Sequence, residues 1–252
     1  MPSPDFPSAA SCLLDALLDG PPAPLTEVAR TRLSVHYATG SGQVPVLCVC
    51  TPDAVRLPHS LVTPALPPAG SATVGAGVLR VGTAAWRPVR WWRPDRPRGM
   101  RPPVHDLRPL LRDAADRCGD PGVTLPAPRY DGLDPATLLG AGPGLTPSGD
   151  DVVAGALVAA HATGDPRHAG WAGATRAALT ATRTTPVSRG MLHHAADGYA
   201  TPQLAGFVTA VCTGRDVDTA TQRLLAVGHS SGVALLAGVV HTLTTYQLEG
   251  AA

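Results

Sequence analysis

The chain has 252 residues, 44% of them apolar, with 20 basic and 19 acidic side chains and a net charge of +1. It can bury a hydrophobic core, and its balanced charge gives no general attraction to nucleic acid or to an anionic membrane. Every basic residue is arginine, so the absence of lysine excludes enzymes that depend on a lysine, such as pyridoxal phosphate enzymes and P-loop nucleotidases.

Cysteine usage and the first residues favour a cytoplasmic protein. The cysteines form no CxxC pair, and residues 1–6 lack the basic stretch of a secretory signal. We therefore expect free thiols and no metal cluster at Cys12, Cys48, Cys50, Cys118 and Cys212. Residues 224–243 are long enough to span a bilayer, but the loop 228–232 in their middle favours soluble helices.

The first 103 residues predict a short helix followed by a β-rich module. Residues 8–19 have the pattern of a helix closed by Gly20, so residues 1–30 are predicted to be a helix and a linker. Gly and Pro turns separate apolar runs, which predicts a small antiparallel sheet or a barrel within residues 31–103. The runs are 33–38, 44–50, 54–57, 78–81 and 85–92.

Residues 104–252 predict an Ala-rich helical domain, which makes the fold class α+β. A Pro-rich connector at 94–103 precedes it, and a helical pattern starts at residue 105. Further helices are predicted at 150–162, 167–182, 187–198, 202–212, 216–227 and 231–247.

One loop of this domain combines glycines with two adjacent acids, in the sequence GPGLTPSGDD at 142–151. Ser148 is placed to cap the next helix, whose positive dipole end and free N–H groups attract an anion. Plain capping is the simpler interpretation. Alternatively, the acids hold Mg²⁺ against a phosphate or accept hydrogen bonds from a substrate amide. The candidate residues are Gly144, Thr146, Ser148, Gly149, Asp150 and Asp151.

Two more loops, RTTPVS at 183–188 and GHSSG at 228–232, also precede predicted helices. Each could be no more than a helix cap. The second matches the letters of a nucleophile elbow, but the preceding residues are helical, so a serine hydrolase is a minor hypothesis. The candidate anion-binding residues are Arg183, Thr184, Thr185, Ser188, Ser230, Ser231 and Gly232.

If the three helix starts converge, they form one polar pocket. In that pocket Asp150, Asp151 and His229 are the predicted catalytic residues, and the two aspartates are also the candidate metal ligands. Residues 86–101, with three tryptophans and many arginines, have three possible roles: a solvated hairpin, a protein interface or, least favoured, a nucleic-acid site.

The three loops together resemble a bacterial family long carried as a domain of unknown function, which includes a subunit of oxamate carbamoyltransferase from anaerobic allantoin catabolism. The order and spacing of the motifs agree over about residues 130–240. The resemblance implies carbamoyl transfer between oxalurate and phosphate, giving oxamate and carbamoyl phosphate, in a multi-subunit enzyme. It implies other carbamoyltransferase subunits and a small anionic substrate as partners.

Two other functions stay open. The chain could be a noncatalytic assembly or ligand-binding protein, or a Mg²⁺-dependent phosphoryl-transfer enzyme, for which the adjacent aspartates are the only support. No cofactor is certain from the sequence, and Mg²⁺ is the one candidate. Neither nucleic acid nor a membrane is expected as a partner.

Overall fold

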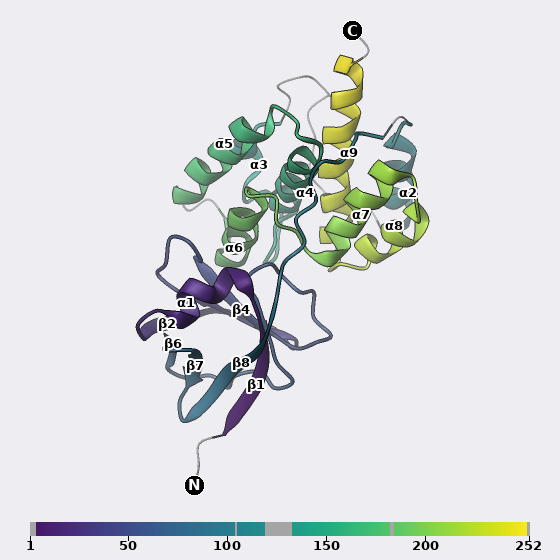
Figure 1. Cartoon of the computed structure of the whole chain (residues 1–252). Coiled ribbons are helices and arrows are strands. Elements are labelled where there is room, and N and C mark those ends of the chain that lie inside the picture. Colours follow the sequence, from purple (N-terminus) through teal and green to yellow (C-terminus); the bar gives the residue numbers. More distant parts are fainter. Residues whose placement is uncertain (1–3, 104, 119–132, 182–183, 251–252) are drawn as a thin grey trace. The chain divides into compact units, whose positions relative to one another are not determined.

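The computed structural model describes residues 4–103, 105–118, 133–181 and 184–250. The chain divides into two compact units, one of Met1–Pro94 with Arg189–Met191 and one of Asp95–Ser188 with Leu192–Ala252. The first is a closed β-barrel and the second is helical (Figure 1). The predicted α+β class, with a barrel-like module followed by a helical domain, is confirmed.

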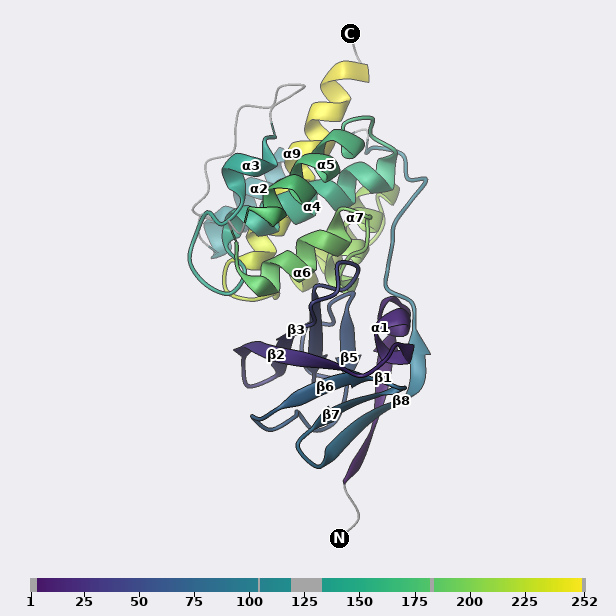
Figure 2. The same cartoon turned by 90° about the vertical axis from the view of Figure 1, so that its left-hand side faces the viewer.

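The barrel closes in the strand order β1-β5-β4-β3-β2-β6-β7-β8. Its pairs are antiparallel except for β1 with β8 and β4 with β5, which are parallel, and Figure 2 shows β1 and β8 side by side. The strands are β1 (Asp5–Ser11), β2 (Ala23–Arg30), β3 (Ser34–Ala38), β4 (Val46–Cys50), β5 (Ser60–Val62), β6 (Ala72–Gly75), β7 (Val78–Val81) and β8 (Ala84–Trp92).

Side chains that alternate in direction along the strands fill the barrel interior with apolar residues. On β3, Val35 and Tyr37 belong to the buried apolar cluster, while His36 between them points to the other face. Trp86 of β8 joins the same cluster, stacks on Phe6 with ring centroids 5.0 Å apart, and donates its indole N–H to the Ala65 carbonyl at 2.8 Å. The apolar runs 33–38, 44–50, 78–81 and 85–92 correctly predicted β3, β4, β7 and β8.

The N-terminal segment differs from its prediction. Residues 8–11 are the end of β1 rather than a helix, and only η1 (Cys12–Leu14) and α1 (Asp15–Asp19) are helical. The predicted linker contains β2. Pairing of β1 with both β5 and β8 overrides the helical preference of the local sequence, as tertiary context often does for short segments. The predicted strand at 54–57 is also wrong, since a turn from Thr51 to Ala54 leads instead to β5.

The helical unit contains α2 (Arg108–Cys118), α3 (Pro135–Leu138), α4 (Ser148–Thr163), α5 (His168–Thr180), α6 (Pro186–Ala195), α7 (Pro202–Thr213), α8 (Val217–Leu225) and α9 (Ser231–Gly250). The helices predicted from residue 150 onward correspond to α4 through α9, with ends shifted by a few residues.

Helix α4 is the centre of this unit (Figure 2). Nearly every residue from Ser148 to Ala162 is buried, as expected for a helix that is apolar on all sides. Two glycines let α4 and α9 approach closely: a Cβ on Gly155 would lie 2.2 Å from the Leu235 carbonyl oxygen, and one on Gly238 would lie 2.0 Å from that of Val152. The first turn of α4, with its two acids, is therefore held inside the protein.

Candidate functional site

The first turn of α4 carries Asp150 and Asp151, whose residues are 0% and 1% exposed. The prediction that Ser148 caps this helix was wrong, because Ser148 is its first residue and Pro147 is the N-cap. Negative charge is favoured at a helix N-terminus, but a buried carboxylate is costly unless donors surround it. The partners of each carboxyl group therefore decide what it can do.

Asp150 is satisfied by donors from two other segments. Its Oδ1 accepts the Gly140 N–H at 2.8 Å, and its Oδ2 accepts the Thr184 hydroxyl. Burial raises the pKa of Asp150, while the hydroxyls of Thr184 and Ser188 and the Gly140 N–H act in the opposite direction. Asp150 thus links α4 to the chain before it and to the loop that precedes α6.

Further hydrogen bonds join the three predicted loops. Thr146 and Ser231 share a hydrogen bond of 3.0 Å between their hydroxyls, which connects the glycine loop to the start of α9. Thr185 donates to the Leu145 carbonyl and, as the predicted N-cap of α6, accepts the Ser188 N–H at 3.1 Å. The starts of α4, α6 and α9 therefore meet in the helical unit, around the two aspartates.

Asp151 is far less satisfied than its neighbour. Its Oδ2 is buried and finds no hydrogen-bond partner among the described residues. Burial is the main reason that the pKa of Asp151 rises to about 8, with a contribution from the negative charge of Asp150, and the hydroxyls of Ser231 and Thr146 only partly oppose it. This carboxyl group is therefore mostly protonated at pH 7.

Ser188 presents a second polar atom of this kind. The residue is 0% exposed. Its hydroxyl lies near enough to Asp150 to lower the pKa of that carboxyl group, but the hydroxyl oxygen forms no hydrogen bond with a described residue. Buried polar atoms normally have a protein or water partner, and exceptions mark strain, function or a bound molecule. Asp151 Oδ2 and the Ser188 hydroxyl thus leave hydrogen-bonding capacity unused inside a packed unit.

The other predicted residues fall into different surroundings. His229 and Gly144 are exposed, and Ser230 is half-buried at the turn before α9. Arg183 lies outside the described residues. For Gly149 and Gly232 the structure gives a packing reason, because a Cβ would lie 2.0 Å from the Leu138 carbonyl oxygen and 2.2 Å from that of Leu224, respectively.

Sequence reasoning did not identify the two backbone groups of the site. The Gly140 N–H and the Leu145 carbonyl complete it, and Gly140 has a φ of 79°, in the left-handed region that favours glycine. The glycine itself was the only signal available, since a backbone donor leaves no mark in the side-chain sequence.

The described residues contain no cluster of three or more histidine, cysteine or acidic side chains that could hold a metal ion. The two aspartates alone would supply carboxylate ligands to Mg²⁺ from one helix turn, and the neighbouring hydroxyls are those of Thr184 at Asp150 and of Thr146 and Ser231 at Asp151. No helix in the described part of the chain is both long and apolar enough to cross a bilayer.

No solved structure matches this chain. A family model does match, over residues 138–243, a segment that contains Asp150, Asp151, Thr184 and Ser231. Asp150 and Asp151, with Thr146, Thr184, Ser188 and Ser231 around them, are called the acid-pair site. The family match confirms the resemblance that the three loops indicate, and the helical segment that builds this site matches the family described as oxamate carbamoyltransferase subunit AllH.

Proposed function

We propose that the chain is a subunit of a carbamoyltransferase, and that it binds phosphate or carbamoyl phosphate and a small carboxylate where α4, α6 and α9 begin. The observation that carries this proposal is the joining of three helix starts around a buried carboxyl group that has an unpartnered oxygen. The family match supports the reaction class and the expectation of partner subunits.

Protonation of Asp151 explains how an anion could lie beside two acids. Two ionised carboxylates would repel a phosphate, but a pKa of about 8 leaves Asp151 neutral at pH 7. A neutral carboxyl group donates one hydrogen bond and accepts others. Asp151 would then donate to an anion oxygen, and its carbonyl oxygen would accept a carbamoyl N–H, while helix N–H groups and hydroxyls bind the phosphate.

The same proton could serve in the transfer step. When a phosphate oxygen attacks the carbamoyl carbon of oxalurate, the bond from that carbon to the oxamate nitrogen breaks, and the nitrogen must gain a proton. Asp151 would give its proton to this nitrogen and regain one from the attacking hydrogen phosphate, so its protonation state is unchanged overall. A group whose pKa lies near the working pH is suited to such an exchange.

Asp150 would act as a positioning residue. It holds the Gly140 N–H and the Thr184 hydroxyl, and so fixes the glycine loop and the start of α6 relative to α4. We expect Thr184→Val to weaken ligand binding without removing any group that contacts the ligand.

A thermal-shift titration tests the binding proposal on the full chain at pH 7. Phosphate, carbamoyl phosphate and oxamate are added to the natural chain, to Asp151→Ala, and to Asp116→Ala, which removes an exposed carboxylate on α2 as a matched control. A ligand at about 100 times its Kd adds roughly 2.7 kcal/mol to the stability of the folded state. We expect the largest shift with carbamoyl phosphate, in the natural chain and in Asp116→Ala.

The proposal requires Asp151→Ala to lose this shift while remaining folded by circular dichroism. An equal shift in Asp151→Ala would place the anion elsewhere on the chain. Absence of a shift with every anion would count against a preformed site in this subunit.

A further inference from the structure

A cavity lies between α7 and α8, which run side by side in the helical unit (Figure 1). Its volume is about 560 Å³, within the range of roughly 300–1,000 Å³ that is common for small-molecule sites. The apolar residues that line it are all small, so no large apolar side chain of the described lining fills the space: Pro202, Ala205, Gly206, Ala210 and Ala220.

Two arginines, Arg215 and Arg223, line this cavity, as do the carboxylates of Asp95 and Asp216. Neither Arg215 nor Arg223 takes part in the ion pairs found among the described residues. A guanidinium group offers two parallel N–H donors that match the geometry of a carboxylate. This wall of the cavity therefore favours an anionic oxygen pair.

Other polar groups of the lining can accept hydrogen bonds from a ligand. Asp95 and Asp216 both line the cavity, and the buried Oε1 of Gln203 has no partner among the described residues. Asp216 has a φ of 54°, a left-handed conformation that is unusual for a residue other than glycine, and its side chain does not cap α8 although it is the N-cap residue. Its carboxylate is thus not used by the helix that it precedes.

We propose that this cavity is a second binding site, for a small molecule that carries both a carboxylate and an amide or ammonium N–H. The carboxylate would lie on Arg215 and Arg223, and the N–H groups would donate to Gln203, Asp95 and Asp216. None of the described residues of the acid-pair site lines this cavity, so the two sites are separate.

A matched series of probes tests the class of ligand. Succinamate has a carboxylate and an amide, succinate has only carboxylates, and succinamide has only amides. Each is titrated into the full chain and followed by ligand-observed NMR. We expect saturable binding that is tightest for succinamate, and Arg223→Gln to weaken it by about tenfold or more, because one charge-assisted hydrogen-bond partner is lost.

Gly206 provides a way to block the cavity while the fold is kept. A Cβ at this lining position would meet no atom within 4 Å, so the side chain of Gly206→Leu enters open space. The change also replaces glycine by a better helix former, so the melting temperature should not fall. Gly173→Leu on α5 is the matched control, because that glycine is equally open and does not line the cavity.

Succinamate binding that is lost in Gly206→Leu and kept in Gly173→Leu and Asp151→Ala would support the second site. Binding that survives Gly206→Leu but disappears in Asp151→Ala would overturn it, because the probe would then occupy the acid-pair site. Absence of saturable binding of all three probes would overturn it as well.

Discussion

Replacing Asp151 by asparagine should change how the stability of the helical unit depends on pH. Burial raises the pKa of this carboxyl group to about 8 in the folded chain, whereas an exposed aspartate in the unfolded chain titrates near pH ~4. Between these values the folded chain binds one more proton than the unfolded chain. The stabilisation by this proton is complete below pH ~4 and is lost as the pH rises toward 8.

The size of the stability change follows from the pH range between the pKa of Asp151 in the unfolded chain and that in the folded chain. A proton held only by the folded state changes the free energy of unfolding by about 1.4 kcal/mol per pH unit. From pH 5 to pH 7 the natural chain should therefore lose about 2–3 kcal/mol relative to Asp151→Asn, which has no proton to lose at this position.

Urea unfolding followed by circular dichroism at 222 nm, at pH 5, 6 and 7, measures this difference. The difference between the two chains is the informative quantity, because burial lowers the pKa of His36 and of His194 to about 4 and gives both chains an opposing pH dependence. Asp116→Asn on the surface of α2 serves as the control. Parallel pH curves for the natural chain and Asp151→Asn would refute the reasoning that Asp151 is buried as a neutral acid.

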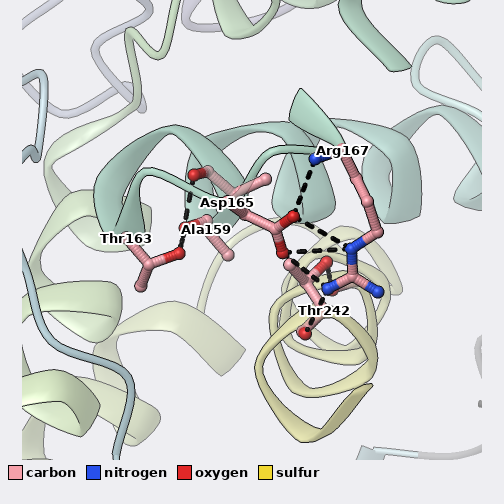
Figure 3. Close-up of polar contacts among 7 residues, drawn as sticks. Ala159, Thr163, Asp165, Arg167 and Thr242 are labelled. Atoms are coloured by element: carbon pink, nitrogen blue, oxygen red, sulfur yellow. Dashed lines mark hydrogen bonds and ion pairs between the residues drawn. The ribbon is translucent and has the colours of Figure 1, made fainter. Parts of the chain in front are cut away.

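Two further substitutions test the packing that holds the site. Gly155→Ala should destabilise the helical unit by about 2 kcal/mol or more in urea unfolding, because the added Cβ meets the Leu235 carbonyl oxygen. The control Gly173→Ala places its Cβ in open space and should be neutral or stabilising. Equal effects of the two substitutions on stability would contradict the close approach of α4 and α9. Asp165→Asn removes the carboxylate that Arg167 contacts at 2.5 Å, where the two side chains are 0% and 6% exposed (Figure 3). Its expected cost is about 3–5 kcal/mol, and a loss no larger than that of a surface substitution would refute the assignment of a buried ion pair.

The sequence predicted the barrel, as one of two forms of a β-rich module, through apolar runs separated by Gly and Pro turns, and the prediction failed where the strands are short or locally ambiguous. β3, β4, β7 and β8 have apolar patterns that identify them without a partner. β5 and β6 have only three and four residues, too few to establish a period. Residues 8–11 at the end of β1 have a helical pattern because they continue into the leucines of η1 and α1, and only the pairing of β1 with β5 and β8 distinguishes the two structures.

The meeting of the three loops was predictable from the sequence, but the division of hydrogen bonds between the two acids was not. Glycines, hydroxyls and acids before an apolar helix indicated an anion site on local grounds alone. Asp150 is satisfied by residues 10 and 34 positions away, and this pairing depends on how α3, α4 and the start of α6 fold together. The sequence predicts the same catalytic role for His229 and the aspartates, yet His229 is exposed and its role stays a prediction.

Replacing the buried Asp151 by asparagine also distinguishes a structural role of this side chain from a chemical one. Asparagine has nearly the same shape and its amide N–H can replace the carboxyl O–H as a donor, so packing alone does not require an acid at this position. Asp151→Asn should therefore be more stable than the natural chain at pH 8, and it should keep the melting-temperature shift caused by phosphate. If the chain acts in the proposed carbamoyltransferase, Asp151→Asn should nevertheless lose carbamoyl transfer in the assembled enzyme, because an amide has no proton to exchange. Full transfer activity in Asp151→Asn would show that the leaving nitrogen takes its proton from another group.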